Sequence, residues 1–175
     1  MTKKEFVRRV VKGKKDLLRA FIDMAKKNDI PFCVIGGLAV NAYAEPVVSL
    51  DMDVVIVVDR LKDLVAALKD RYEVNIYPNS INVSSASSDL RIQIQTDSRY
   101  QDFLGRAAYK DVLGYKLPVA AIKDVLQGKV WAAMDEARRP SKRQKDLADI
   151  LRLIETKKAL ILLVPPSLKK RLSLS

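Results

Sequence analysis

The sequence predicts an α+β fold, in which a mixed sheet is flanked by helices and the C-terminal half is helical. Short runs rich in β-branched residues alternate with segments of helical period up to about residue 97. Beyond that point the apolar residues repeat mainly at helical spacing, and no internal repeat or low-complexity linker divides the chain. We therefore expect residues 1–97 to form the sheet core with an N-terminal helix, and residues 98–175 to pack on it as one compact unit.

The first half is predicted from caps, turns and apolar runs. Thr2 and Glu5 form a capping box for a helix over residues 3–28, which has an irregularity at Gly13 and ends before Pro31. The apolar run over residues 32–35 predicts a buried strand that ends at a glycine pair. A short helix over residues 38–44 follows. Residues 53–58 are almost all valine and isoleucine, which predicts a strand buried on both faces.

The elements that follow are predicted in the same way. Asp59 is the expected N-cap of a helix that ends near Arg71. Strands are expected at residues 72–77, 81–85 and 90–96, and helices at residues 98–113, 119–137 and 141–156. Ser141 is the expected N-cap of the last of these helices. Residues 115–117 form a short extended piece before Pro118, and residues 165–175 form either a short helix or a loose end.

The composition excludes several classes of site. The chain has no histidine, which removes histidine-based acid–base catalysis and histidine-containing zinc sites. Its single cysteine, Cys33, cannot form an intramolecular disulfide or a cysteine-rich metal site, and fits a reducing cytoplasm. The longest apolar run, residues 159–164, is far below the ~20 residues that span a bilayer, and no signal-type apolar core follows the basic N-terminus. We therefore expect a cytoplasmic protein without a membrane span.

The net charge of +11 is unevenly distributed along the chain. Residues 1–31 hold ten Lys and Arg against four Asp and Glu, and residues 98–175 hold seventeen against eight. Residues 32–97, in contrast, hold five basic against nine acidic residues. An acidic centre between basic flanks suits a site where a cation and a polyanion meet. The alternative is that the basic residues only form solvated helix faces.

Two short motifs lie near the acidic centre. Gly36 and Gly37 end one strand and open a helix, where bare backbone amides can approach a triphosphate. Asp51 and Asp53 stand at the head of the next strand, and the two-residue period of a strand points both carboxylates to one face, with Cα atoms about 6–7 Å apart. Such a pair suits Mg²⁺ or Mn²⁺ shared with substrate phosphates. Taken separately, the glycines indicate a tight turn and the aspartates a strand cap.

In this order and spacing the two motifs resemble the nucleotidyltransferase (polymerase β-like) superfamily. Its pattern is a hydrophobic residue and Gly-Gly or Gly-Ser, followed by two acidic residues that alternate with hydrophobic ones on the next strand. Gly36, Gly37, Asp51 and Asp53 match it, and Ser49 stands where many members carry Ser or Thr. The resemblance implies transfer of a nucleoside monophosphate from an NTP. It implies that Asp51 and Asp53 are catalytic and hold the metal, and that Gly36, Gly37 and Ser49 bind the nucleotide.

Two later segments resemble the AbiEii/AbiGii-type toxin branch of that superfamily. One is residues 126–132 with Lys129, and the other is residues 143–150 with Lys145, Asp146 and Asp149. The branch implies a nucleotide-binding role for Lys129, an additional role for the other three residues, RNA or tRNA as acceptor, and an antitoxin protein as partner. Each has an alternative. Lys129 is then a solvated helical lysine, Trp131 packs in the core instead of stacking on a base, and Asp146 and Asp149 form salt bridges on the helix surface.

One residue departs from the superfamily pattern. Members usually carry a third carboxylate on a later strand, where it activates the attacking hydroxyl, and the corresponding position in residues 90–96 is Gln93. An amide can ligate a metal weakly but cannot act as a base. Three functions therefore stay open: a nucleotidyltransferase, a catalytically weak or inactive module that binds nucleotide, RNA or a partner protein, and a plain basic α+β domain.

Overall fold

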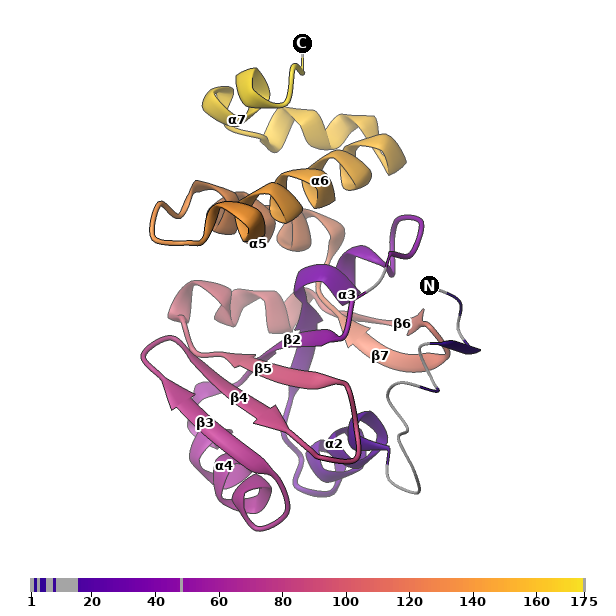
Figure 1. Ribbon diagram of the computed structural model, residues 1–175, viewed down its shortest axis with the longest axis vertical. Coiled ribbons are helices and arrows are strands. Elements are labelled where there is room, and N and C mark those ends of the chain that lie inside the picture. Colours follow the sequence, from indigo (N-terminus) through magenta and orange to yellow (C-terminus); the bar gives the residue numbers. More distant parts are fainter. Residues whose placement is uncertain (1, 3, 6–7, 9–15, 48, 175) are drawn as a thin grey trace.

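The computed structural model has an α+β fold built on one mixed sheet of seven strands (Figure 1). It describes the whole chain except residues 1, 3, 6–7, 9–15, 48 and 175. The strands are β1 (Phe32–Ile35), β2 (Asp51–Ile56), β3 (Glu73–Tyr77), β4 (Ser80–Ser84), β5 (Arg91–Gln95), β6 (Ala108–Val112) and β7 (Tyr115–Val119). Their order across the sheet is β3-β4-β5-β2-β1-β7-β6.

Helices lie at both ends of the sheet. They are α2 (Leu17–Lys27), α3 (Gly36–Val40), α4 (Leu61–Lys69), α5 (Ile122–Met134), α6 (Pro140–Thr156) and α7 (Pro166–Arg171). Among the described residues, 3₁₀ segments lie at Val58–Arg60 between β2 and α4, at Ser98–Arg106 between β5 and β6, and at Lys158–Leu163 between α6 and α7. Figure 1 shows α2 and α4 at one end of the molecule and α5, α6 and α7 stacked at the other, with the sheet between them.

The centre of the sheet brings distant polar residues into one row. Strand β2 is antiparallel to β1, with Asp53 opposite Ile35, and parallel to β5, with Asp53 opposite Gln93. Because side chains alternate along a strand, Asp51 and Asp53 share one face while Met52 and Val54 are fully buried on the other. The predicted strand start at residue 53 is two residues late, since β2 begins at Asp51 and includes both carboxylates.

The predicted helix over residues 98–113 is wrong. Asp97 caps a 3₁₀ helix that ends at Arg106, and the chain then turns into a hairpin of β6 and β7. Leu113 and Gly114 have φ of 53° and 97°, the conformation that a two-residue hairpin turn needs. Tyr115, Leu117 and Val119 are buried while Lys116 is exposed, which is the alternation of a strand. Strand β7 lies parallel to β1, so the sheet extends beyond residue 97; the division of the chain at residue 97 stays a prediction.

The first predicted helix also differs. Asp16 has extended backbone, and its carboxylate accepts the amide of Arg19 at 2.9 Å, so α2 begins as a separate helix and the single helix over residues 3–28 is wrong. The capping box at Thr2 and Glu5 is formed, and Gly13 lies outside the described residues.

Other caps shift by a few residues. A 3₁₀ turn contains Asp59, and Arg60 is the residue at the N-cap of α4. Arg139 takes the N-cap of α6, ahead of the predicted Ser141, because Pro140 fits the first helical position. Within the described part of the chain, no helix is both long and apolar enough to cross a membrane.

Candidate functional site

A cavity of about 210 Å³ lies where β2 and β5 face the C-terminal helices. Nine of the ten residues predicted for the site line it: Gly36, Gly37, Ser49, Asp51, Asp53, Gln93, Lys129, Lys145 and Asp146. Asp149 is the exception, because its carboxylate is buried behind Lys129. The fold therefore gathers residues from four separate elements, which are β2, β5, α5 and α6, around the glycine pair at the start of α3.

The glycine pair packs directly on the strand that carries the carboxylates. Gly36 has φ of +67°, and a Cβ at this position would lie 1.9 Å from Oδ2 of Asp53. Both the backbone conformation and the close approach of Asp53 therefore require glycine. A Cβ on Gly37 would lie 3.1 Å from the Ser49 hydroxyl, which in turn donates to the Asp51 carbonyl at 3.3 Å. The glycines and the aspartates form one wall of the cavity.

The two strand carboxylates have unequal surroundings. Asp51 pairs with Arg91 at 2.8 Å and lies 3.8 Å from the Lys142 ammonium, and about a third of its side chain is exposed. The Asp53 carboxylate makes no side-chain hydrogen bond or ion pair with any residue that the structure describes, although its backbone lies in the sheet between β1 and β5. Burial raises the pKa of Asp53 to about 6, against the opposing effect of Lys129 and with a further rise from Asp51. The pair can accept a cation. A bound cation would stabilise the ionised form of Asp53 more than that of Asp51, because Asp53 has no cation partner among the described residues.

The opposite wall contains a buried chain of alternating charges. The Lys129 ammonium lies 2.9 Å from Asp146 and 2.7 Å from Asp149. Arg138 binds the other oxygen of Asp146 at 2.7 Å, and Arg152 binds Asp149 at 2.7 Å. Burial alone lowers the pKa of Lys129, but Asp149 and Asp146 outweigh it, so the pKa is raised and the ammonium stays charged. Lys129 reaches the cavity as a charge already shared by two carboxylates.

Arg152 extends this chain to the loop that precedes β2. Its guanidinium donates to Asn41 at 2.9 Å and also to the Glu45 carbonyl. Asn41 in turn donates to the Val47 carbonyl at 2.8 Å and accepts the Val47 amide at 3.1 Å. Helix α6 therefore holds the loop that carries Ser49. Sequence reasoning missed this link, since nothing local associates residue 152 with residues 41–47.

The alternative of salt bridges on the surface of α6 does not hold for Asp146 and Asp149, whose carboxylates pair with the buried Lys129. Asp146 and Asp149 turn inward to Lys129, and Lys145 stays exposed at the cavity. A signal for this was present, because Asp146 and Asp149 fall on the same helix face as the buried Ile150 and Leu153.

Several lining residues were missed. Arg138, Tyr100, Gln95 and Asp124 all line the cavity. Asp124 is held by Arg106 through two hydrogen bonds of 2.9 Å. Arg138 and Asp124 carried no signal beyond their charge, and Tyr100 was assigned to the helix that the structure replaces. Gln93, which pairs with Asp53 from β5, also lines the cavity, and its assignment to the third-carboxylate position stays a prediction.

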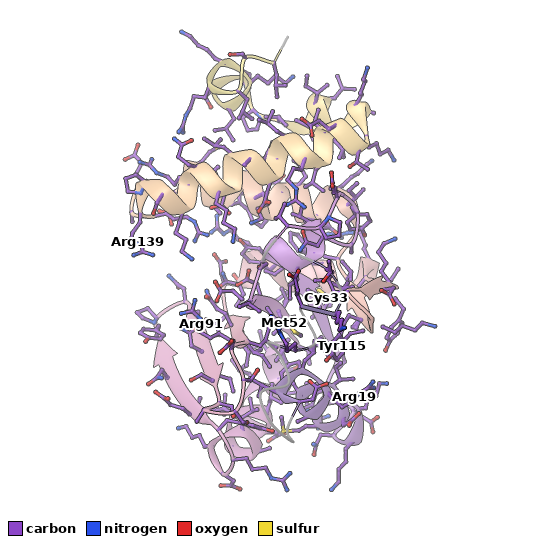
Figure 2. All side chains as sticks on the ribbon, turned by 45° about the vertical axis from the view of Figure 1, so that its right-hand side comes forward. Arg19, Cys33, Met52, Arg91, Tyr115 and Arg139 are labelled. Atoms are coloured by element: carbon purple, nitrogen blue, oxygen red, sulfur yellow. The ribbon has the colours of Figure 1, made fainter. Side chains whose placement is uncertain are left out.

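Side chains from both walls reach the same side of the molecule. Figure 2 shows Arg91 on the sheet and Arg139, at the start of α6, on that side, whereas Cys33 and Met52 lie in the interior. Lys142 and Lys145 line the cavity from α6 as well. The helical wall of the cavity therefore carries basic side chains, while Asp51 and Asp53 stand on its sheet wall.

No protein-family model matches the chain, and none of the curated proteins does. Solved structures do match. The antibiotic-resistance factor ANT(2'')-Ia in complex with adenylyl-2''-tobramycin has a TM-score of 0.65 and 14% identity, over 89% of this chain and 96% of that one. An antigenic nucleotidyltransferase-like protein from Paracoccidioides brasiliensis has a TM-score of 0.56 and 16% identity, over 98% of this chain and 94% of that one.

A third match is the lincosamide adenylyltransferase LnuA with bound lincomycin. Its TM-score is 0.54 and its identity 11%, over 78% of this chain and 95% of that one. At such low identity these likenesses show the fold alone. The chain has the nucleotidyltransferase-like fold that its two early motifs predicted.

Proposed function

We propose that the protein transfers a nucleoside monophosphate from an NTP to an acceptor hydroxyl, with release of pyrophosphate. One observation carries the proposal: Gly36 lies against Asp53 so closely that no side chain fits between them. A glycine cradle for phosphates and a carboxylate pair for a cation therefore share one cavity. The adenylyltransferases of similar fold add support.

The oxygen ligands that the cavity offers fit a divalent cation whose remaining ligands are water and substrate phosphates. The described residues contain no cluster of three or more His, Cys, Asp or Glu placed to hold a metal. Mg²⁺ uses one or two carboxylates and otherwise water and substrate phosphates, so Asp51 and Asp53 are sufficient protein ligands for Mg²⁺ or Mn²⁺. When bound, the ion would neutralise charge on the phosphates and help to align the attack.

The residues of this chain have separate tasks in the transfer. The amides at Gly36 and Gly37 and the Ser49 hydroxyl orient the triphosphate, and Lys145 adds a positive charge at the entrance. The acceptor oxygen forms a bond to the α-phosphorus, and the bond from that phosphorus to the bridging oxygen breaks, so that pyrophosphate leaves. Gln93 cannot take the hydroxyl proton. We therefore expect the proton to pass to solvent and the transfer to be slow.

RNA, with tRNA as the precedent in the resembling branch, is the acceptor that the charge distribution favours. Arg138, Arg139, Lys142, Arg143 and Lys145 cluster at the start of α6, beside the cavity. Contacts from such side chains reach phosphates, so RNA affinity should fall about tenfold or more as monovalent salt rises from roughly 50 to 200 mM. The toxin role and an antitoxin partner rest on the sequence resemblance.

A second candidate function is favoured by Gln93. Without a carboxylate at this position, the cavity suits a module that binds nucleotide or RNA and transfers nothing. A base normally contributes about 10²- to 10⁴-fold to such a step, which separates the two functions experimentally.

Labelled NTPs, Mg²⁺ and total RNA test the proposal directly. Label should appear in RNA with the native chain, disappear with Asp53→Asn, and increase with Gln93→Asp. The position of Gln93 opposite Asp53 makes the last variant the most informative one. Nucleotide binding without transfer, in both the native chain and Gln93→Asp, would support the inactive module and overturn the enzyme.

A further inference from the structure

A second hollow adjoins the cavity and belongs to no function described so far. It measures about 500 Å³ and shares Gln95, Tyr100, Ala132 and Arg138 with the site cavity. Its own walls add Asn79 and Trp131, among other residues. We call it the side hollow. Because the two share these four lining residues, the side hollow lies directly beside the site cavity.

Trp131 forms a rigid aromatic platform on the wall of the side hollow. Phe103 lies nearly parallel to it, with ring centroids 5.9 Å apart at 10°, and Tyr100 meets it edge-on at 5.2 Å. Over the Trp131 ring lies the guanidinium of Arg99, at 4.9 Å from the centroid. Arg99 is largely exposed, so a planar cation on a flexible stem covers the platform. A planar ligand of similar thickness can take its place.

The other groups in the side hollow suit an uncharged ligand. Arg99 is paired with Asp97 at 2.7 Å, and Arg138 with Asp146 at 2.7 Å. Asp135 also lines the hollow, where its carboxylate accepts the Ala137 amide at 3.0 Å. The side-chain amides of Asn79 and Gln95 supply both donors and acceptors, and Gln95 uses its oxygen for the Asp97 amide, which leaves its NH₂ group to donate. Aromatic stacking together with amide hydrogen bonds is how proteins bind nucleobases.

We propose that the side hollow binds a nucleobase, which displaces Arg99 from the face of Trp131. The proposal rests on the proposed function in one respect, because it places the phosphates of the same ligand system at Gly36 and Gly37. The base has two sources: the NTP itself, or a nucleotide of an RNA acceptor. Both present the same planar, hydrogen-bonding ring to the platform.

The protein supplies its own probe, because Trp131 is its single tryptophan. The full chain is titrated with Mg·ATP, with Mg·tripolyphosphate and with an RNA hexamer that lacks a triphosphate, and its fluorescence is recorded. Stacking on the ring should quench the emission with Mg·ATP, while tripolyphosphate should compete for the phosphate site without quenching. Quenching by the hexamer alone assigns the base to the acceptor. Absence of quenching by both ATP and RNA overturns the proposal.

A variant and a matched control complete the test. Trp131→Leu should weaken Mg·ATP binding at least about fivefold, measured by calorimetry, and leave Mg·tripolyphosphate binding unchanged. Tyr109→Leu, an exposed aromatic on β6, should change neither. Circular dichroism verifies that both variants are folded.

The outcomes separate this proposal from the proposed function. If Trp131→Leu binds ATP as tightly as the native chain, the side hollow holds no base, although the phosphate site stands. If neither ATP nor tripolyphosphate binds the native chain, the proposed function fails as well.

Discussion

The two walls of the cavity each carry a pair of aspartates, and the pairs differ in how their charges are satisfied. On the sheet wall, Asp51 is partly exposed and paired at the surface, and Asp53 has no ion pair with a described residue. On the helical wall, Asp146 and Asp149 are each 2% exposed or less and each meets two cations. Identical side chains therefore stand in opposite electrostatic states within one site.

This difference separates a binding role from a structural one. A buried carboxylate between two cations has its charge balanced by the fold, and removing a cation leaves an uncompensated charge. A carboxylate whose pKa is raised by burial destabilises the fold when ionised, and it gains when a cation arrives from outside. The sheet wall is thus suited to a ligand, and the helical wall to holding α5, α6 and the preceding loop together.

The largest effect is expected at the centre of the helical wall. Lys129→Met leaves Asp146 and Asp149 buried with one cation fewer each, and should lower the free energy of unfolding by about 3–5 kcal/mol. Urea denaturation measures the change. Lys145→Met, an exposed lysine at the same cavity, should stay within about 0.5 kcal/mol of the native chain. Equal stability of the two variants would contradict the structural role of the charge chain.

The next largest effect is expected at Gly36. Gly36→Ala places a Cβ where φ is +67° and where Oδ2 of Asp53 already lies, so Asp53 must move. We expect a loss of about 2 kcal/mol in stability, together with loss of Mg²⁺-dependent ATP binding, measured by denaturation and calorimetry. Gly105→Ala is the matched control, since nothing lies within 4 Å of its added Cβ. Native ATP affinity in Gly36→Ala would argue against the glycine cradle.

On the sheet wall the sign of the effect reverses. The pKa of Asp53 is about 6 in the folded protein and near 3.8 when unfolded, so the folded state binds the proton more tightly between these values. The contribution of Asp53 to the free energy of unfolding therefore falls as pH rises from about 4 to 6.

Asp53→Asn removes this dependence. In the absence of divalent ions it should be more stable than the native chain at pH 7, by on the order of 1–2 kcal/mol, and equal to it below about pH 4. Thermal unfolding at several pH values, with a chelator present, measures the difference. A destabilised Asp53→Asn at pH 7 would mean that its carboxylate is balanced by the fold, like Asp146.

The smallest effect is expected at Arg91. Its pair with Asp51 is exposed, so Arg91→Gln should change the free energy of unfolding by less than about 0.5 kcal/mol. Removing this cation should nevertheless tighten Mn²⁺ binding a few fold, because the guanidinium and the metal compete for one carboxylate. Electron paramagnetic resonance of free Mn²⁺ measures the affinity, with Arg71→Gln, a substitution outside the cavity lining, as control.

The sheet wall was predictable from sequence because its geometry is local. Strand alternation alone places Asp51 and Asp53 on one face, and the glycine pair precedes them in the same strand–helix–strand stretch. The charge chain was only half predictable. The residues were singled out, but the closure of Lys129 on Asp146 and Asp149 depends on how α5 packs on α6, which no local pattern specifies.

The hairpin of β6 and β7 shows a different limit. Residues 98–113 carry apolar residues at spacings that suit a helix, but residues 108–112 form β6 and pair antiparallel with β7. The pairing of β7 with β1 then decides in favour of strands. Tertiary contact overrides local propensity here. Because residues 98–113 were assigned to a helix, the position of Tyr100 beside the site was not predicted.

The insertion of β7 beside β1 also sets an order of events during synthesis. Strand β1 emerges early from the ribosome and pairs with β2, but its other edge stays open until β7 has been made. A nascent chain that ends near residue 97 already carries the glycine cradle and both sheet carboxylates. The edge of β1 that β7 covers later is still unpaired in it, although every residue of β1 is buried in the folded protein. Completion of the sheet thus waits for a long-range contact, which slows folding and leaves this strand edge open to aggregation for longer.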